Sequence, residues 1–175
     1  MIVDIKAKYT NEELDFNSKK EYMNENILIQ YGQLAAQKAS IPISISDSSI
    51  LMDLEIEMCL KILNIWEVDK YNLDGKQILN ENIFVDREKF IYKILLGKIL
   101  RLIPGGVTIL SIGINDSLAR RLTQALGYAI SELCSSYIKL VTNKDCINLE
   151  NVFTKEALED LMESYLIEYN KTALN

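Results

Sequence analysis

The stretch "KILRLIPGGVTILSIGINDSLARRLTQALG", which runs from Lys98 to Gly127, decides the fold, because it concentrates glycine in the most apolar part of the chain. It holds one of the two prolines and four of the seven glycines. A segment of this composition can be a phosphate-binding loop, a membrane insertion or a helix that packs closely against its neighbours. The choice among these three sets the class of the protein.

A phosphate-binding loop is excluded by the residues that surround the glycines. The GxxxxGK[ST] loop needs a lysine and a hydroxyl residue after the glycines, so that they reach the phosphates and the metal ion. The segment "PGGVTILSIG" (104–113) has no such lysine and follows no strand pattern, and a GxGxxG dinucleotide loop is also missing. We therefore expect no bound nucleotide and no other cofactor.

The small residues of this stretch indicate close helix packing. No proline follows Pro104, so one long helix or two helices can start there and reach about residue 141. Glycine inside a helix costs about 1 kcal/mol relative to alanine, so its use needs a reason, and small residues at four-residue steps commonly let two helices approach. The candidate packing positions are Gly113, Ser117, Ala119, Thr123, Gly127 and Ser131.

The other segments have helical periodicity as well. Apolar residues recur at steps of three and four in the segments 18–39, 48–66, 86–102 and 153–169. "SKKE" at Ser18 predicts a capping box at the first helix, Pro42 ends that helix, and Thr154 caps the last one. The prediction is an all-α fold: a compact bundle of five to six helices with one long helix rich in Gly, Ala and Ser.

The N-terminal residues follow a different period. In "MIVDIKAKYT" (1–10) apolar and charged residues alternate, which is typical of a half-buried strand, although a flexible arm accounts for the segment equally well. We therefore divide the chain into an N-terminal arm, residues 1–15, and a single helical domain, residues 16–175.

The composition excludes several functions. A net charge of −6 and a pI near 4.8 oppose nucleic-acid binding, which needs a basic face. The chain has no histidine, which removes the commonest neutral-pH base, the usual nucleophilic triads and most zinc sites. Cys59, Cys134 and Cys146 are widely spaced, and the first two lie in apolar helical patterns, so buried free thiols in a reducing cytoplasm are expected.

Carboxylate pairs are the remaining candidates for catalysis. They occur on polar stripes such as Asp53 with Glu57, where a solvated surface is the simpler interpretation. We therefore predict no catalytic residue and no metal ligand. An enzyme with an unrecognised carboxylate site stays as one alternative, and a homo-oligomeric structural protein built through the small residues stays as another.

A membrane surface is a further candidate partner. No segment has the ~18 consecutive apolar residues of a spanning helix. Between residues 86 and 121, however, seven Lys or Arg face three acids in an otherwise acidic chain, as in helices that lie on anionic membranes. A buried helix with a solvated basic stripe has the same pattern. The candidate interaction surface comprises Lys89, Lys93, Lys98, Arg101, Arg120 and Arg121.

Two stretches together resemble a known family. They are "AAQKASIPISISDSSILMDLEIEMCLKILNIWEVD" (35–69) and "LIPGGVTILSIGINDSLARRLTQALGYAISEL" (102–133). They resemble the helical domain of unknown function that follows the GTPase domain in Era-like and dynamin-like bacterial GTPases, with related copies in bacterial inner-membrane proteins. The residues that carry the resemblance are Ile41, Pro42, Asp47, Ile103, Pro104, Gly105, Asn115, Thr123, Leu126 and Gly127.

This sequence departs from the family pattern in its polarity. Ser44 stands where the family has a second proline, the second glycine of the other motif is displaced, and Asp116, Arg120 and Arg121 stand where the family is small and apolar. The resemblance implies a non-catalytic accessory domain that acts through a protein partner, such as a GTPase domain. The expected location is the cytoplasm, with peripheral association at the inner membrane.

Overall fold

The described part of the chain is predominantly helical, which confirms the all-α prediction. In this computed structural model it comprises residues 16–43, 49–71, 74, 78–79, 102, 113–142 and 152–172. The only strand-like pairing in these ranges is one isolated bridge between Ile43 and Ile114. The elements are α1 (Phe16–Tyr22), η2 (Met23–Leu28), α2 (Ile29–Lys38), α3 (Ser49–Ile65), η4 (Val68–Tyr71), α8 (Asp116–Thr142) and α9 (Lys155–Thr172).

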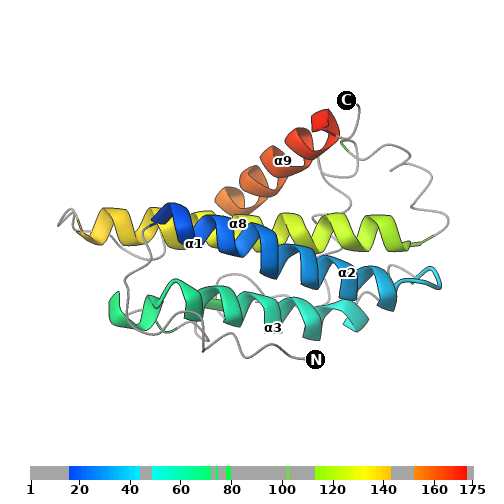
Figure 1. Ribbon diagram of the computed structural model, residues 1–175, viewed down its shortest axis with the longest axis horizontal. Helices are drawn as coiled ribbons and strands as arrows, with labels where there is room; N and C mark the ends of the chain where they lie inside the picture. Colours follow the sequence, from blue (N-terminus) through cyan, green and yellow to red (C-terminus); the bar gives the residue numbers. More distant parts are fainter. Residues whose placement is uncertain are drawn as a thin grey trace.

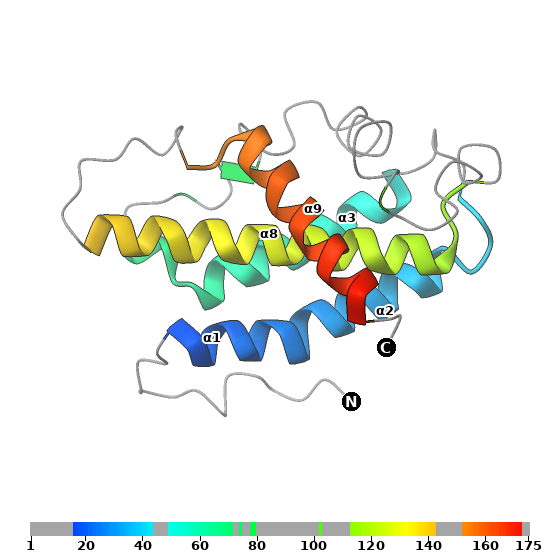
Figure 2. The same ribbon diagram turned by 90° about the horizontal axis from the view of Figure 1, so that it is seen from above.

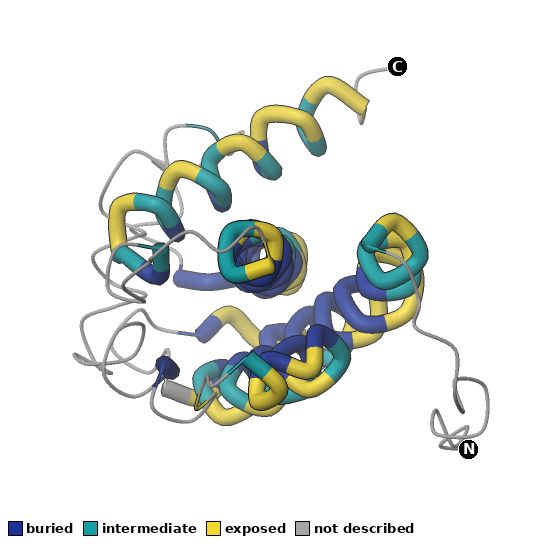
Figure 3. Tube along the Cα trace, turned by 90° about the vertical axis from the view of Figure 1, so that its left-hand side faces the viewer, coloured by how far each residue is buried: buried dark blue, intermediate teal, exposed yellow. Residues whose placement is uncertain are grey.

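The long helix α8 is the centre of the molecule. Figures 1 and 2 show α9 crossing it on one side, α3 running along the opposite side, and the continuous helix from α1 to α2 beside it. Most of its residues are buried, and in Figure 3, where the central helix is seen nearly end-on, dark blue turns lie behind a teal and yellow near end. Each of the other long helices therefore buries its apolar face mainly against α8.

The first three elements form one uninterrupted helix with a π-helical segment in the middle. The residues at the junctions, Tyr22 and Leu28, keep right-handed helical dihedrals, so the helix widens at η2 without breaking. Ser18 lies inside α1, which begins at Phe16, so the predicted capping box at Ser18 is wrong. The helix ends at Lys38, close to the predicted end before Pro42.

The start of α8 differs from the prediction. Gly113 has a φ of 96°, in the left-handed region that glycine tolerates, and it is not helical. Ile114 exchanges two backbone hydrogen bonds with Ile43, at 2.7 and 2.9 Å. The Asn115 side chain then accepts a bond from the Leu118 amide at 2.9 Å, which caps α8. A single helix from Pro104 to residue 141 is therefore wrong, because the backbone turns at Gly113 and the helix starts after Asn115.

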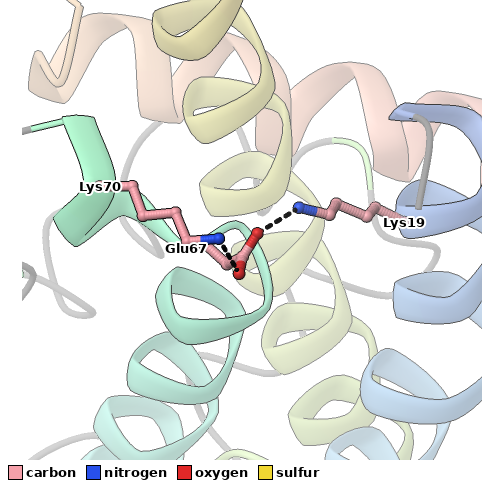
Figure 4. A network of polar contacts seen from close by, with 3 residues as sticks. All are labelled: Lys19, Glu67 and Lys70. Carbon is pink, nitrogen blue, oxygen red and sulfur yellow. Dashed lines mark hydrogen bonds and ion pairs between the residues drawn. The ribbon is translucent and has the colours of Figure 1, made fainter. Parts of the chain in front are cut away.

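Helix α3 has the narrow polar stripe expected from its sequence. Asp53 and Glu57 are exposed, and Lys61 forms an ion pair with Glu57 at 3.3 Å. After α3 ends at Ile65, Glu67 has a positive φ (54°) in the turn that leads to η4. Figure 4 shows the Glu67 carboxylate between Lys19 of α1, at 3.3 Å, and Lys70 of η4, at 2.7 Å. These exposed ion pairs connect the end of α3 to α1.

Helix α9 begins at the predicted cap. The Thr154 hydroxyl oxygen accepts a bond from the Ala157 amide at 3.1 Å, and the preceding Phe153 is buried against the ring of Tyr137. Near its other end, the Asn170 side chain donates to the Leu102 carbonyl at 2.6 Å. The predicted strand-like arm (1–15), the helix predicted over 86–101 and Cys146 lie outside the described residues. The predicted total of five to six helices therefore stays a prediction.

Candidate functional site

Gly127 lies where three helices meet. A Cβ atom built on it would be 2.4 Å from Cδ2 of Leu28 and 3.0 Å from Sδ of Met58, so η2 and α3 both touch the bare backbone of α8 there. Ala119, Thr123 and Ser131 are also buried in this core. The small residues thus pack inside one chain.

Two members of the predicted packing set lie outside this contact. Ser117 is exposed in the first turn of α8, and Gly113 precedes the helix with a positive φ. Gly113 is therefore not part of α8, and Ser117 is not buried with the other small residues of the helix. Since the other small residues are buried within the chain, they are not available for contact with a second copy, and the ladder no longer supports a homo-oligomer.

A second close approach was missed by the sequence reasoning. A Cβ atom on Gly32 of α2 would be 2.8 Å from Cγ and from Nε2 of Gln124, so the absence of a side chain at Gly32 makes room for that glutamine. Gln124 is 8 % exposed, and its Oε1 atom has no hydrogen-bond partner in the described part of the chain. A glycine inside a helical pattern was the available signal, but its partner follows only from the helix packing.

Gln124 belongs to the wall of an open pocket of about 380 Å³ between η2, α2, α8 and α9, which we call the tyrosine pocket. Leu28 and Ile29 give it an apolar side, and the Ile29 side chain is 46 % exposed. Its volume is in the range of small-molecule and side-chain binding sites. The lining residues are Asn24, Leu28, Ile29, Gln124, Tyr128, Tyr165, Glu168, Tyr169 and Thr172.

Three tyrosines form a row along this pocket. The ring centroids of Tyr128 and Tyr165 are 5.2 Å apart, and those of Tyr165 and Tyr169 are 6.3 Å apart. The guanidinium carbon of Arg121 lies 5.1 Å from the ring centroid of Tyr169, within cation–π distance. Arg121, predicted as part of a basic interaction surface, therefore packs on the last tyrosine of the row.

The polar groups of the pocket are suited to binding. Burial raises the pKa of Tyr165 to about 12, with Tyr169 as a smaller cause. Burial, followed by the carboxylates of Glu132 and Glu168, raises the pKa of Tyr128. Both phenols therefore stay protonated near neutral pH and cannot act as bases. Glu168, the one carboxylate among the lining residues, has an exposed side chain that makes no ion pair or hydrogen bond to described residues.

The remaining basic candidates lie elsewhere. Arg120 is exposed at the surface of α8. Lys89, Lys93, Lys98 and Arg101 lie outside the described residues, so the membrane-surface interaction stays a prediction. Co-sedimentation with anionic liposomes tests it, and reversal of Lys89, Lys93 and Arg101 to Glu should abolish binding. None of the helices in the described ranges is long and apolar enough to cross a membrane.

Glu55 of α3 is a buried acid that the sequence reasoning did not single out. It is 3 % exposed, and it accepts one hydrogen bond, from the Thr123 hydroxyl at 3.3 Å. Burial raises its pKa from an ordinary value of 4.5 to about 8, and the bond from Thr123 only partly offsets this. Glu55 is therefore protonated at neutral pH, and it is absent from the pocket lining.

The two described cysteines are buried free thiols, as predicted. Burial raises the pKa of both Cys59 and Cys134, so neither is a thiolate at neutral pH. No group of three or more Cys, Asp or Glu side chains in the described ranges is arranged to hold a metal ion.

The comparisons with known proteins leave this site without a described counterpart. No family model matches the chain, and no curated protein or solved structure matches it either. The resemblance to the helical domain of bacterial GTPases therefore stays a prediction made from the sequence.

Proposed function

We propose that this protein is a non-catalytic interaction module, and that its tyrosine pocket receives a segment of a protein partner. The observation that carries the proposal is the pocket itself: it is open, apolar on one side and polar on the other. Its one carboxylate, Glu168, has no ion pair with any residue that the structure describes. Most apolar residues of α8 are buried, whereas the pocket between η2 and α9 is open in the described part.

Binding is favoured over catalysis by the protonation states in the pocket. General acid–base catalysis needs groups with pKa values near the working pH, commonly two that differ. Tyr128 and Tyr165 have raised pKa values, and Glu168 has no second carboxylate beside it in the pocket lining. A row of protonated phenols instead offers rings and hydroxyl groups to a bound segment, as recognition surfaces rich in tyrosine do.

The resemblance to GTPase-associated domains suggests a GTPase domain as the partner. The position of the pocket is compatible with a docking role, because it is open and its walls include α2 and α9. Both helices lie beside the central helix α8 (Figures 1 and 2). The partner's identity enters this proposal only through that resemblance.

Site-specific photo-crosslinking tests the proposal. A photoreactive phenylalanine analogue replaces Ile29, which is half exposed on the pocket wall, and cross-links are induced in cells of the source organism. The matched control carries the analogue at Asp53, which is exposed on α3 at the opposite side of α8 (Figure 1). We expect one protein to cross-link at position 29 and not at position 53. The same products at both positions, or none at 29, would contradict a partner at this pocket.

A further inference from the structure

The pocket's chemistry identifies the kind of group that it binds. We propose that the tyrosine pocket binds the side chain of a lysine: the ammonium group lies between the Glu168 carboxylate and the rings of Tyr128 and Tyr165, and the aliphatic stem lies along Leu28 and Ile29. That the lysine belongs to a protein partner rests on the function proposed above, whereas the recognition of an alkylammonium group rests on the pocket alone.

The distribution of cations over aromatic rings is the first support. In the described part of the chain, four rings have a Lys or Arg side chain within 4.9–5.9 Å of the centroid, and these are Phe16, Tyr31, Trp66 and Tyr169. No described Lys or Arg lies over Tyr128 or Tyr165, although both rings line an open pocket. These two rings are thus free to attract a cation from outside.

The charge beside these rings has the matching sign. Glu168 lies on the pocket wall without an ion pair or hydrogen bond to its carboxylate in the described ranges. Its negative charge interacts electrostatically with the Tyr128 phenol, because it contributes to the raised pKa of that group. Glu132, the other acid that acts on Tyr128, is already paired with Lys20 at 2.7 Å. The unpaired charge in the pocket therefore belongs to Glu168.

The remaining surface fits a long aliphatic stem that ends in hydrogen-bond donors. Leu28 and Ile29 supply the apolar side, against which the methylene groups of a lysine can pack while its charged end stays polar. Gln124, another lining residue, has a buried carbonyl oxygen, Oε1, without a donor in the described part. An ammonium group carries three donors and no acceptor, so it complements this set.

Arg121 defines the limit of the site. Its guanidinium already occupies the ring of Tyr169, so a second cation is repelled from that end of the row. The site proposed here therefore comprises Tyr128, Tyr165 and Glu168. This arrangement favours one cationic side chain over a polycation, because Arg121 repels additional positive charge.

The test is an NMR titration of the full-length, ¹⁵N-labelled protein with two matched probes. One probe is Nα-acetyl-lysine methylamide, and the other is Nα-acetyl-norleucine methylamide, which keeps most of the stem and lacks the charge. We expect the lysine probe to shift the amide signals of Ile29, Gln124 and Glu168 with a Kd on the order of 1 mM, and the norleucine probe to bind roughly tenfold more weakly or not at all. Equal binding of both probes, or binding of neither, overturns the proposal.

Two variants of α9 test whether the Glu168 carboxylate binds the ammonium group. Glu168→Gln should weaken the lysine probe by roughly five- to tenfold, because it removes the charge and keeps the shape. Glu163→Gln, on the same helix outside the pocket lining, should leave the affinity unchanged. Circular dichroism confirms that both variants fold. Unchanged affinity in Glu168→Gln contradicts the proposed site.

The two proposals fail separately. If position 29 cross-links to a partner but the lysine probe does not bind, the protein is still an interaction module, and the lysine assignment is wrong. If the probe binds as expected but no partner cross-links at position 29, the ammonium site is correct and the docking function is wrong.

Discussion

At the scale of single residues, Glu55 makes the stability of this protein depend on pH. In the folded state its pKa is about 8, whereas an unfolded chain has an ordinary value near 4.5. Between these values the folded state holds a proton that the unfolded state has lost, so the free energy of unfolding decreases as pH rises through this window, by up to about 1.4 kcal/mol per pH unit.

Replacement of this acid should remove the dependence. We expect Glu55→Gln to be more stable than the parent at pH 9, and to vary less between pH 5 and 8, because an amide has no charge to bury. Urea unfolding at a series of pH values measures this. Glu57→Gln is the control, since Glu57 is exposed and its pKa is lowered, chiefly by the bond from Tyr31. A parent protein with equal stability at pH 5 and 9 would contradict the assignment.

Gly127 is the second residue for which the structure predicts a defined change in stability. Gly127→Ala gains about 1 kcal/mol of helix propensity, but its methyl group would overlap Leu28 and Met58, and such overpacking costs about 1–3 kcal/mol. We therefore expect a net destabilisation of about 1 kcal/mol. Gly127→Leu should prevent folding of the monomer.

A double-mutant cycle distinguishes overpacking from a general defect. Leu28→Ala removes the Cδ2 atom that Gly127→Ala would meet at 2.4 Å, so the double variant should be more stable than the sum of the single changes predicts. Ser117→Ala, an exposed change in the same helix, should alter stability by less than about 0.5 kcal/mol. Strict additivity would show that the two side chains do not meet.

At the scale of elements, the ends of the helices were read from the sequence with mixed success. Thr154 predicts the start of α9, because a hydroxyl residue precedes a regular amphipathic pattern there. The helix does begin at the next residue. The start of α8 could not be placed, because residues 103–115 are uncharged and mostly apolar, and they have no polar face that marks a helix. The start of this helix is set by the cap at Asn115 and by the bridge between Ile114 and Ile43, which is distant in sequence.

The pocket was beyond prediction for a similar reason. Tyr128 and Tyr165 were readable as apolar positions of two helices, but their meeting depends on the angle at which α9 crosses α8. Gln124 is a polar residue on a helix whose sequence suggests no partner, and only the approach of α2 at Gly32 buries it. The periodicity of a sequence shows which face of a helix is buried. It does not show which other helix that face contacts, because this depends on the packing of the whole bundle.

The two helix caps provide a test at this scale. We expect Asn115→Ala and Thr154→Ala each to cost about 1 kcal/mol, since each loses an acceptor for an amide of the first turn. Hydrogen exchange should separate them. Loss of the Thr154 cap should speed exchange in the first turn of α9, whereas loss of the Asn115 cap on the central helix should lower protection across the bundle. Asn115→Asp, which keeps the acceptor, should be nearly neutral.

At the scale of the whole molecule, one residue reports on the assembly of three elements. Trp66, the only tryptophan, is buried, donates from Nε1 to the Ser131 hydroxyl of α8 at 3.0 Å, and lies with its ring centroid 5.4 Å from that of Phe16 in α1. Its environment therefore requires α1, the end of α3 and α8 to be in place together.

We therefore expect the tryptophan fluorescence and the far-ultraviolet circular dichroism to change together in urea, as in a two-state transition. Ser131→Ala leaves the indole N–H without its partner and should lower both midpoints equally, at a cost of about 1–3 kcal/mol. A loss of helix signal at lower urea than the fluorescence change would indicate that α9, which does not touch Trp66 in these contacts, unfolds on its own.

The placement of α9 has a mechanical consequence. This helix packs chiefly on α8, while the opposite wall of the tyrosine pocket comes from η2 and α2. If a partner's side chain binds in the pocket as proposed, it contacts both α9 and α2, two helices that are otherwise held together mainly through α8. Binding of the partner would then slow the local opening of α9, the helix at the C-terminal end of the described part.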